Sequence, residues 1–417
     1  MIGDRFDTAG RVAGVRLLTD EVFVDPYPTY ALLREHDPVH WDAELNGWLL
    51  TRYEDVVAAL RDHDTYSSRR IGLLAARGGA DPSAPMRKFI GLASQWMWML
   101  DPPEHTRVRK LMNQGFSPRD VRALEPMIRQ VVGELVDGLL AREEFDLIPD
   151  LSYAVPALVL CDLYGLPRTD AALITSWSDT IKLFLGGTPD MAATGVPAAV
   201  ALEGMMTYLT GVIHDRRASP REDLISRLVH AEEDGDRLGD EELCSNLLLL
   251  LVATYETSID LIGNGLRGLL TLRDQWELVK ARPELVPAAV EEMLRWDGPV
   301  QLTHRLMTRD VQLHGRRIEA GQLVYLVRGA ANRDPGRFAN PDRFDVTRTE
   351  TGHVALGVGV HYCIGAGLAR MEAVLAVNEL STRIPRLALD PDRPPRWRAD
   401  NLQFRGLSAL PAQVGRG

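Results

Sequence analysis

The chain has 417 residues, of which 45% are hydrophobic and 25% are charged, and its formal net charge is −11. These values are typical of globular proteins and exclude a disordered or fibrous chain, while the acidic balance disfavours binding to a phosphate backbone, so we expect no nucleic-acid partner. Three scattered cysteines, Cys161, Cys244 and Cys363, are too few for a disulfide framework and indicate a reducing compartment. The most apolar run, 247–253, is far shorter than the roughly 20 residues that cross a bilayer, and the N-terminus has no apolar signal segment. We therefore expect a cytoplasmic protein with no membrane span.

The N-terminal region predicts a helix, a hairpin and a second helix. Residues 27–35 and 53–61 have helical spacing, and between them two short apolar runs, 39–41 and 48–51, flank the turn residues Asn46-Gly47. Serine, glycine and proline then break every periodic pattern over 66–94, so we expect an irregular segment that extends to about residue 100. Loops of this length inside a compact domain are usually lids, binding loops or disordered segments.

Helical spacing dominates from residue 103 to about 279. The expected helices of this part cover 118–140, 151–164, 175–185, 196–217, 224–233 and 241–270, and two more follow at 284–296 and 365–384. The helix at 241–270 is apolar on every side at its centre, which is typical of a helix that runs through the middle of a protein. Short strands are predicted over 303–306, 322–327 and 402–407. Because no repeat or linker interrupts the chain, we predict one large domain over 1–417 that is mainly α with a minor β portion.

A single cysteine lies among glycines in the segment 356–370, with the sequence LGVGVHYCIGAGLAR, just before the last long helix. Glycine permits close approach to the main chain, and N–H groups at a helix start favour a negative sulfur. The pattern suits a thiolate held against a flat group. The alternative is that Cys363 is a small buried hydrophobic residue. A zinc site is disfavoured, because Cys161 and Cys244 lie in helix interiors without paired-ligand spacing.

Several motifs in a fixed order carry a resemblance to a known family. They are Asp101-Pro102-Pro103-Glu104-His105-Thr106-Arg107, the stretch 253–258, Glu292-Met293-Leu294-Arg295, Ala331-Asn332-Arg333-Asp334-Pro335 followed by Phe338, Pro341 and Phe344, and the Gly-x-Gly-x-His-x-Cys-x-Gly pattern at 357–365. Together they resemble the cytochrome P-450 family, most closely its soluble bacterial members, over nearly the whole chain. The resemblance implies that 356–370 is the haem-thiolate loop, 241–270 the oxygen-activating helix and 66–100 a substrate-access loop.

The resemblance implies a haem b cofactor whose iron is bound by the thiolate of Cys363, the metal ligand of the site. The two haem propionates need cationic or hydrogen-bonding partners, and the family correspondence assigns this role to His105, Arg109, Arg305 and His361. The alternative for each of the four is a solvated surface side chain.

Two further groups follow from the same resemblance. Glu256 and Thr257 match the acid and threonine that open the central helix locally and relay protons, and we expect them to be catalytic; the alternative is a threonine that bonds back to its own helix. Glu292, Arg295 and Arg343 match a buried ion network that supports the fold and haem loading.

The chain departs from the family pattern at two positions. Thr254 stands where a glycine is usual, and we hypothesise that it contacts substrate, which puts simple hydroxylation in doubt. Leu356 replaces a phenylalanine seven residues before the cysteine, and we expect this to change redox tuning more than reaction type.

The family placement also indicates where a small-molecule substrate binds. Contacts are expected from 66–100, from 182–185, from the central helix, from 299–302 and from the Gln403-Phe404 turn. The candidate substrate residues are Trp98, Thr254, Gln301, Gln403 and Phe404, with the two glutamines as polar orienters. Trp96, Met97 and Trp98 suit a rigid hydrophobic ligand, although core packing explains them equally well. The expected substrate is a hydrophobic natural-product intermediate, with aromatic ones among the candidates.

The expected reaction is a monooxygenation that uses O₂ and two electrons for hydroxylation, epoxidation or oxidative coupling. The sequence has neither a flavin fingerprint nor an iron–sulfur cysteine cluster, so a separate ferredoxin or flavodoxin with its reductase is implied. Arg107 and Lys110 are candidates for a local basic patch that receives an acidic donor, the alternative being solvated charges without a partner. A peroxide-driven oxidase and a non-catalytic haem-binding or gas-sensing protein are the competing functions.

Overall fold

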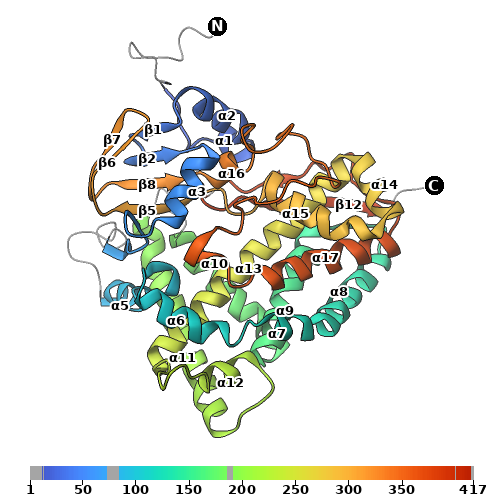
Figure 1. Cartoon of the computed structure of the whole chain (residues 1–417). Coiled ribbons are helices and arrows are strands. Elements are labelled where there is room, and N and C mark those ends of the chain that lie inside the picture. Colours follow the sequence, from blue (N-terminus) through green and yellow to red (C-terminus); the bar gives the residue numbers. More distant parts are fainter. Residues whose placement is uncertain (1–11, 13, 73–83, 186–190, 400, 415–417) are drawn as a thin grey trace.

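The computed structural model describes residues 12, 14–72, 84–185, 191–399 and 401–414. The helices are α1 (Asp20–Val24), α2 (Tyr27–His36), α3 (Tyr53–Arg61), α5 (Ala84–Ala93), α6 (Glu104–Asn113), α7 (Pro118–Ala123), α8 (Glu125–Leu140), α9 (Ala154–Tyr164), α10 (Ala171–Leu185), α11 (Met191–Ala218), α12 (Leu224–Val229), α13 (Asp240–Thr271), α14 (Arg273–Ala281), α15 (Val286–Asp297), α16 (Arg328–Ala331) and α17 (Ala366–Arg383), with a π-helical turn η3 (Ile148–Ser152) and the short 3₁₀ turns η2 (Met97–Met99), η4 (Arg168–Asp170), η5 (Pro283–Leu285) and η6 (Gly359–His361). The strands are β1 (Val39–Asp42), β2 (Gly47–Leu50), β3 (Tyr66–Ser67), β4 (Glu144–Asp146), β5 (Thr303–Met307), β6 (Val311–Leu313), β7 (Arg316–Ile318), β8 (Leu323–Leu326), β9 (Leu387–Leu389), β10 (Arg396–Trp397), β11 (Leu407–Ala409) and β12 (Pro411–Val414). The prediction of a mainly α fold with a minor β portion is confirmed (Figure 1).

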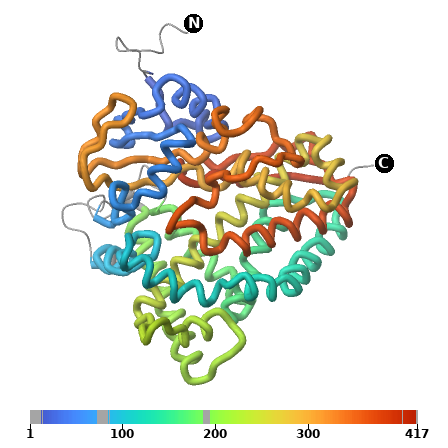
Figure 2. The backbone as a smooth tube through the Cα atoms, in the orientation of Figure 1, coloured from blue at the N-terminus to red at the C-terminus, as the bar shows by residue number. Residues whose placement is uncertain are grey.

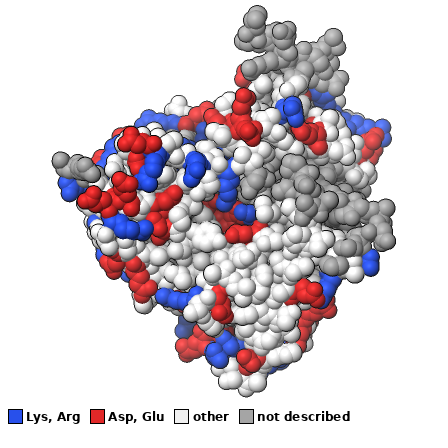
Figure 3. Space-filling view, turned by 180° about the vertical axis from the view of Figure 1, so that it is seen from behind, with Lys and Arg blue, Asp and Glu red and all other residues white. Residues whose placement is uncertain are grey.

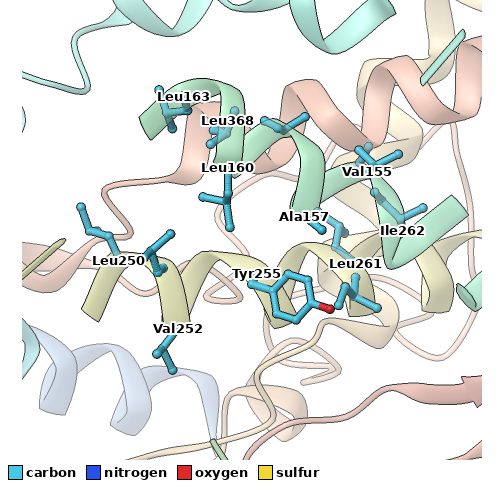
Figure 4. Close-up of a cluster of buried hydrophobic side chains, with 14 of the residues drawn as sticks. Val155, Ala157, Leu160, Leu163, Leu250, Val252, Tyr255, Leu261, Ile262 and Leu368 are labelled. Carbon is cyan, nitrogen blue, oxygen red and sulfur yellow. The ribbon is translucent and has the colours of Figure 1, made fainter. Parts of the chain in front are cut away.

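The central helix α13 runs through the middle of the helical body and packs on α9, α10, α11, α15 and α17. Its apolar side chains meet those of α9 and α17 in a buried cluster that includes Leu160, Tyr255, Ile262 and Leu368 (Figure 4). Two helices, α13 and α11, are long and apolar enough to cross a membrane by length and composition alone. In the most apolar part of α13, 83% is buried inside the protein, as in the core helix of a globular protein. In the most apolar part of α11, 39% is buried.

The largest sheet joins the two ends of the chain. Its strands follow the order β1-β2-β8-β5-β3, and the hairpin β1–β2 turns through Asn46, whose φ of 49° suits an asparagine. Strand β2 pairs in parallel with β8, so N-terminal and C-terminal segments lie side by side (Figure 2). The antiparallel partner of β8 on its other side is β5, which carries Arg305. This sheet therefore fixes Arg305 and the segment after β8 next to the helical body.

Most predicted elements are present, and the differences have local physical reasons. The segment 66–100, expected to be irregular, contains the helix α5. Residues 73–83 of the segment lie outside the described residues. The closing strand expected at 402–407 forms only in part, because Phe404 makes a single antiparallel bridge to Val300 and the strands begin at Leu407 in β11 and continue in β12. Between Asp240 and Thr271 the structure is α-helical throughout, so the expected local opening of the central helix is not seen there.

Charged side chains are interspersed on the surface. On the face turned away from Figure 1, basic and acidic residues alternate around the edge, and uncharged residues cover much of the lower half (Figure 3).

Candidate active site

One cavity collects most of the predicted site residues. It lies between the middle of α13, the segments 299–305 and 355–365, the N-terminal part of α6 and the Gln403-Phe404 turn. The described residues that line it include one thiol, Cys363, and one carboxylate, Glu256, together with five Lys or Arg side chains. The remaining lining is largely apolar, as is usual for a pocket that takes an organic ligand.

The loop before α17 holds the sulfur of Cys363 at the cavity. Gly357 and Gly359 both have a φ of 73°, which glycine adopts without strain, and the N–H of Cys363 donates to the carbonyl of Leu356 at 2.9 Å. Burial raises the pKa of the Cys363 thiol, while the N–H of Gly365 and the arginines 109 and 328 oppose the shift. A bound metal cation would hold this sulfur as a thiolate.

The space beside the sulfur is kept open by Gly365. A side chain at this position would come within 3.9 Å of the Thr254 hydroxyl and 4.0 Å of the Cys363 sulfur. The glycine therefore leaves room for a flat group between the loop and α13. Leu356 and Thr254, the two departures from the family pattern, both line this part of the cavity.

The other side of the cavity is strongly cationic and has too few counter-ions. Arg70 and Arg305 are buried and Arg328 is half-buried, and desolvation lowers the pKa of each guanidinium, to about 9 for Arg70 and about 10 for the other two. Asp101 is the carboxylate that opposes this shift for Arg70 and Arg305. Arg328 keeps a buried Nε without a hydrogen-bond partner. An anionic ligand would satisfy these groups.

Two histidines complete the cationic side. The rings of His105 and His361 lie 4.2 Å apart between centroids, and His361 Nε2 is 3.0 Å from the hydroxyl of Ser68. Burial is the main cause that lowers the pKa of His105 to about 4 and that of His361 to about 2. Within the part of the chain that the structure describes, both ring nitrogens of the buried His105 lack a hydrogen-bond partner, as expected for a side chain that faces a polar ligand.

These observations fit a haem. A porphyrin with two carboxylates needs an axial ligand on one face and donors for its anionic edge, and the cavity offers the sulfur of Cys363, the gap at Gly365 and the unpaired donors of the cationic side. The predicted cofactor residues His105, Arg109, Arg305, His361 and Cys363 all line this cavity. Arg109 also bonds Asn113 through its Nε.

The predicted catalytic pair lies on α13 at the cavity, but both side chains are engaged. Lys182 Nζ donates to Glu256 Oε1 at 2.5 Å, and Arg398 Nη2 lies 2.7 Å from the same oxygen. Oε2 has no hydrogen-bond partner among the described residues. Burial, followed by repulsion from Asp260, raises the pKa of Glu256. The hydroxyl of Thr257 donates to the Ala253 carbonyl at 2.9 Å, which is the bond that the alternative interpretation describes.

The buried ion network contains Glu292 and Arg295 but not the side chain of Arg343. Arg295 bonds both carboxylate oxygens of Glu292 at 2.6 and 2.7 Å. The third member is Arg348, whose Nε lies 3.1 Å from Glu292 Oε2. Arg343 is 66% exposed and contributes only its carbonyl, which accepts from Arg295. The expectation for Arg343 is therefore wrong, because the loop turns its side chain outward and brings in the arginine five residues later.

Four of the five predicted substrate residues line the cavity, namely Trp98, Thr254, Gln403 and Phe404. The expectation for Gln301 is wrong, because this buried side chain points away from the described lining. Its amide donates to the Gly298 carbonyl at 2.9 Å and lies 3.4 Å from the Tyr27 hydroxyl. Gln301 thus stabilises the segment that leads into β5.

The predicted basic patch at Arg107 and Lys110 is not supported. Arg107 forms ion pairs with Asp236 and Glu242, and Lys110 Nζ lies 3.5 Å from Glu233. The acidic segment 232–242 therefore compensates both charges, a contact that the spacing within α6 could not reveal.

The sequence interpretation missed Arg70 and Arg328. For Arg328 a signal was available, because a cation directly after the apolar run of β8 must either leave the core or meet a ligand. Arg70 lies within the segment expected to be irregular and carries no comparable local signal.

Comparison with known proteins agrees with this geometry. The family model described as Cytochrome P450 matches residues 200–381. The chain is 40% identical to "Cytochrome P450 107B1" of Saccharopolyspora erythraea, with 98% of this chain and all of the relative covered, and 39% identical to "Cytochrome P450 monooxygenase PikC" of Streptomyces venezuelae, with 96% and 94% covered. Among solved structures, the Bacillus subtilis bacillaene polyketide synthase cytochrome P450 PksS superposes with a TM-score of 0.87 at 32% identity, over 97% of this chain and all of that one.

Fold, cavity and cysteine loop define a haem-thiolate enzyme. The chain belongs to the cytochrome P450 family, in agreement with the resemblance of its motifs, and it is a monooxygenase of that family.

Proposed function

We propose that the chain binds haem b through Cys363 and inserts one atom of O₂ into a bulky hydrophobic natural product, with electrons from a separate redox protein. The observation that carries the proposal is the cavity itself. It has a half-buried thiol at one side and an apolar space next to α13, and at the other side Arg328 Nε and both nitrogens of His105 have no hydrogen-bond partner within the described protein. Haem iron bound by a thiolate supplies activation of O₂ for this insertion.

The cationic side would hold the two propionates. Arg70, Arg305 and Arg328, together with His105 and His361, present donors from five separate parts of the chain. Charge-assisted hydrogen bonds of this kind are each worth about 1.5–3 kcal/mol. They would orient the cofactor, while Gly365 adds no side chain of its own to the space between Thr254 and the sulfur.

Glu256 and Thr257 would move protons at the cavity. Glu256 Oε2 is free of protein hydrogen bonds, and burial favours its protonated form. The hydroxyl of Thr257 can keep its bond to the Ala253 carbonyl or turn to a ligand. A Glu256→Gln variant should bind substrate normally and turn over more slowly by about 10²-fold, the lower end of the range for loss of a positioned acid or base.

The substrate would lie against Trp98, Thr254 and Phe404, with the Gln403 amide as a polar contact. Relatives with printed names such as "6-deoxyerythronolide B hydroxylase" (35% identical) and "Vitamin D(3) 25-hydroxylase" (37% identical) support a bulky, largely apolar substrate. The Thr254 hydroxyl lies close to the gap at Gly365, so Thr254→Ala should change the product ratio or the affinity. A variant with both unchanged would remove Thr254 from the substrate site.

Electrons would come from a cytoplasmic ferredoxin or flavodoxin with its reductase. Since Arg107 and Lys110 are compensated, the docking surface would have to use other groups.

The decisive test begins with the absorption spectrum of the reduced, carbon monoxide-bound protein. The thiolate signature is expected in the native protein and should be lost in Cys363→Ser, with Cys161→Ser as the matched control.

Product formation is then compared under three conditions: with ferredoxin and reductase, with peroxide alone, and with neither. Turnover with peroxide alone at the same rate would favour the peroxide-driven alternative, and haem binding without turnover under any condition would favour a non-catalytic role. A panel of candidate substrates, scored by the shift of the haem spectrum on binding, identifies the class of ligand.

A further inference from the structure

A carboxylate on α15 binds both ends of the cysteine loop and has no part in the functions described so far. Helices α15 and α17 pack on each other beside this loop (Figure 1). Glu291 Oε1 accepts from Nε of Arg370 at 2.5 Å, and Glu291 Oε2 accepts from Arg370 Nη2 and from His353 Nε2, each at 3.0 Å. His353 precedes the loop and Arg370 follows it, early in α17. One side chain of α15 therefore joins the start and the end of the loop.

The same cluster reaches the residue next to the sulfur. Nη1 of Arg370 donates to the hydroxyl of Tyr362 at 3.0 Å, and Tyr362 directly precedes Cys363. On the other side of the loop, Nδ1 of His353 accepts from the N–H of Ala355 at 3.3 Å. The guanidinium of Arg370 is thus held beside the cysteine, and the carboxylate that it binds fixes its direction.

The charges within the cluster balance each other. Burial opposes ionisation of Glu291, but hydrogen bonds from His353 and Arg370 outweigh this effect and lower its pKa to about 2. The hydrogen bond to Glu291 raises the pKa of Arg370 above its ordinary value. The ring of His353 accepts at Nδ1 and donates at Nε2, which is the hydrogen-bonding pattern of a neutral imidazole. The cluster therefore consists of one negative and one positive charge.

The positive charge of this pair acts on the sulfur. Burial raises the pKa of the Cys363 thiol, and Arg370 is among the arginines that oppose the shift, together with Arg109 and Arg328. Arg109 and Arg328 line the cavity, where propionates would compensate them, whereas the counter-ion of Arg370 is Glu291. The side chains of Arg370 and Glu291 are 32% and 43% exposed, so solvent weakens their field without removing it.

We infer that Glu291 is a positioning residue that sets the reduction potential of the haem iron through the charge and direction of Arg370. Reduction adds one electron from the redox protein, so an uncompensated cation beside the sulfur favours the ferrous form and an uncompensated anion favours the ferric form. With both charges present, Glu291 cancels most of the effect of Arg370. This inference rests on the proposed function, because it requires haem bound through Cys363.

The test is a spectroscopic redox titration of the holoenzyme, which needs neither substrate nor redox partner. Glu291→Gln leaves Arg370 uncompensated and should raise the midpoint potential, whereas Arg370→Gln leaves Glu291 uncompensated and should lower it. For one partly screened charge we expect the equilibrium between ferric and ferrous protein to change by about threefold to tenfold in each direction. The double variant Glu291→Gln/Arg370→Gln removes both charges and should return the potential to near its native value.

The opposite signs separate an electrostatic role from a merely structural one. A loosened loop would move the potential in the same direction in both single variants and would move it furthest in the double variant. Glu291→Asp keeps the charge and should stay closer to the native potential than Glu291→Gln. Glu277→Gln is the matched control, because Glu277 forms exposed ion pairs with Arg273 and Lys280 on α14, and it should leave the potential unchanged. Shifts of the same sign in the two single variants, or no shift in Glu291→Gln, would overturn the inference.

The absorption spectrum of the reduced, carbon monoxide-bound protein is the second readout. The thiolate signature should persist in all of these variants, because the pair acts on the sulfur through its field and does not provide the ligand. Loss of the signature in Glu291→Gln would mean that the cluster holds the ligand in place, and would also overturn the inference. Failure of the proposed function is distinguishable, since the native protein itself would then lack the signature.

Discussion

Replacing Arg348 by alanine should destabilise the protein far more than replacing Arg343. Arg348 is 7% exposed, donates to Glu292 at 3.1 and 3.2 Å and also bonds the carbonyls of Ala339, Asn340 and Arg343. Removing one partner of a buried ion pair costs about 3–5 kcal/mol. Because Glu292 keeps its bonds to Arg295 and to the N–H of Asp345, we expect a loss of unfolding free energy at the lower end of this range, about 3 kcal/mol.

The assay is thermal unfolding followed by circular dichroism and haem absorbance. An unfolding entropy of about 2.1 cal/mol/K per residue gives about 0.9 kcal/mol/K for this chain, so a loss of about 3 kcal/mol lowers the Tm by about 3 °C. Arg343→Ala is the matched control, since its exposed side chain lies 4.0 Å from Asp345 and should change stability by less than about 0.5 kcal/mol. Equal shifts for the two variants, or a larger one for Arg343→Ala, would refute the assignment of Arg348 to the network.

Three further outcomes follow from the site. Arg328→Met should weaken haem retention by about 10- to 100-fold, measured by transfer of haem to an acceptor protein, because a donor to a charged ligand is lost. Gln403→Ala should weaken the substrate-induced shift of the haem spectrum, whereas Gln301→Ala should lower the Tm and leave that shift in place. Glu372 is a fully buried acid on α17, and burial raises its pKa to about 7 in the folded state, so folding binds a proton between the ordinary value of 4.5 and about pH 7. Native stability should fall by about 3 kcal/mol across this range relative to Glu372→Gln, as measured by denaturant unfolding at several pH values.

Local patterns were sufficient for much of the fold. The all-round apolar centre of 241–270 predicts the buried helix α13, and Asn46-Gly47 predicts the β1–β2 hairpin, because each depends on neighbouring residues alone. The Cys363 loop could be predicted in the same way, because its glycines and its cysteine lie close together in the sequence.

The sequence alone did not predict which charged side chains pair over long distances in the chain. Whether Arg343 or Arg348 turns toward Glu292 depends on the path of the loop, and whether Arg107 is free depends on an acidic segment more than a hundred residues away. The prediction for Gln301 was wrong for a related reason, because its side-chain amide is engaged by the Gly298 carbonyl and the Tyr27 hydroxyl. The direction of such a side chain depends on contacts between residues that are far apart in the sequence, and local patterns do not predict these contacts.

The parallel pairing of β2 with β8 constrains the order in which the protein can assemble on the ribosome. Gly47 meets Leu323, so the large sheet cannot close until most of the chain has emerged, and contacts between such distant segments form slowly. The cysteine loop follows that sheet in the chain and is synthesised after it. The helical body therefore cannot complete its folding before the C-terminal third of the chain is synthesised. Until then the apolar side chains around α13 remain exposed and can cause aggregation.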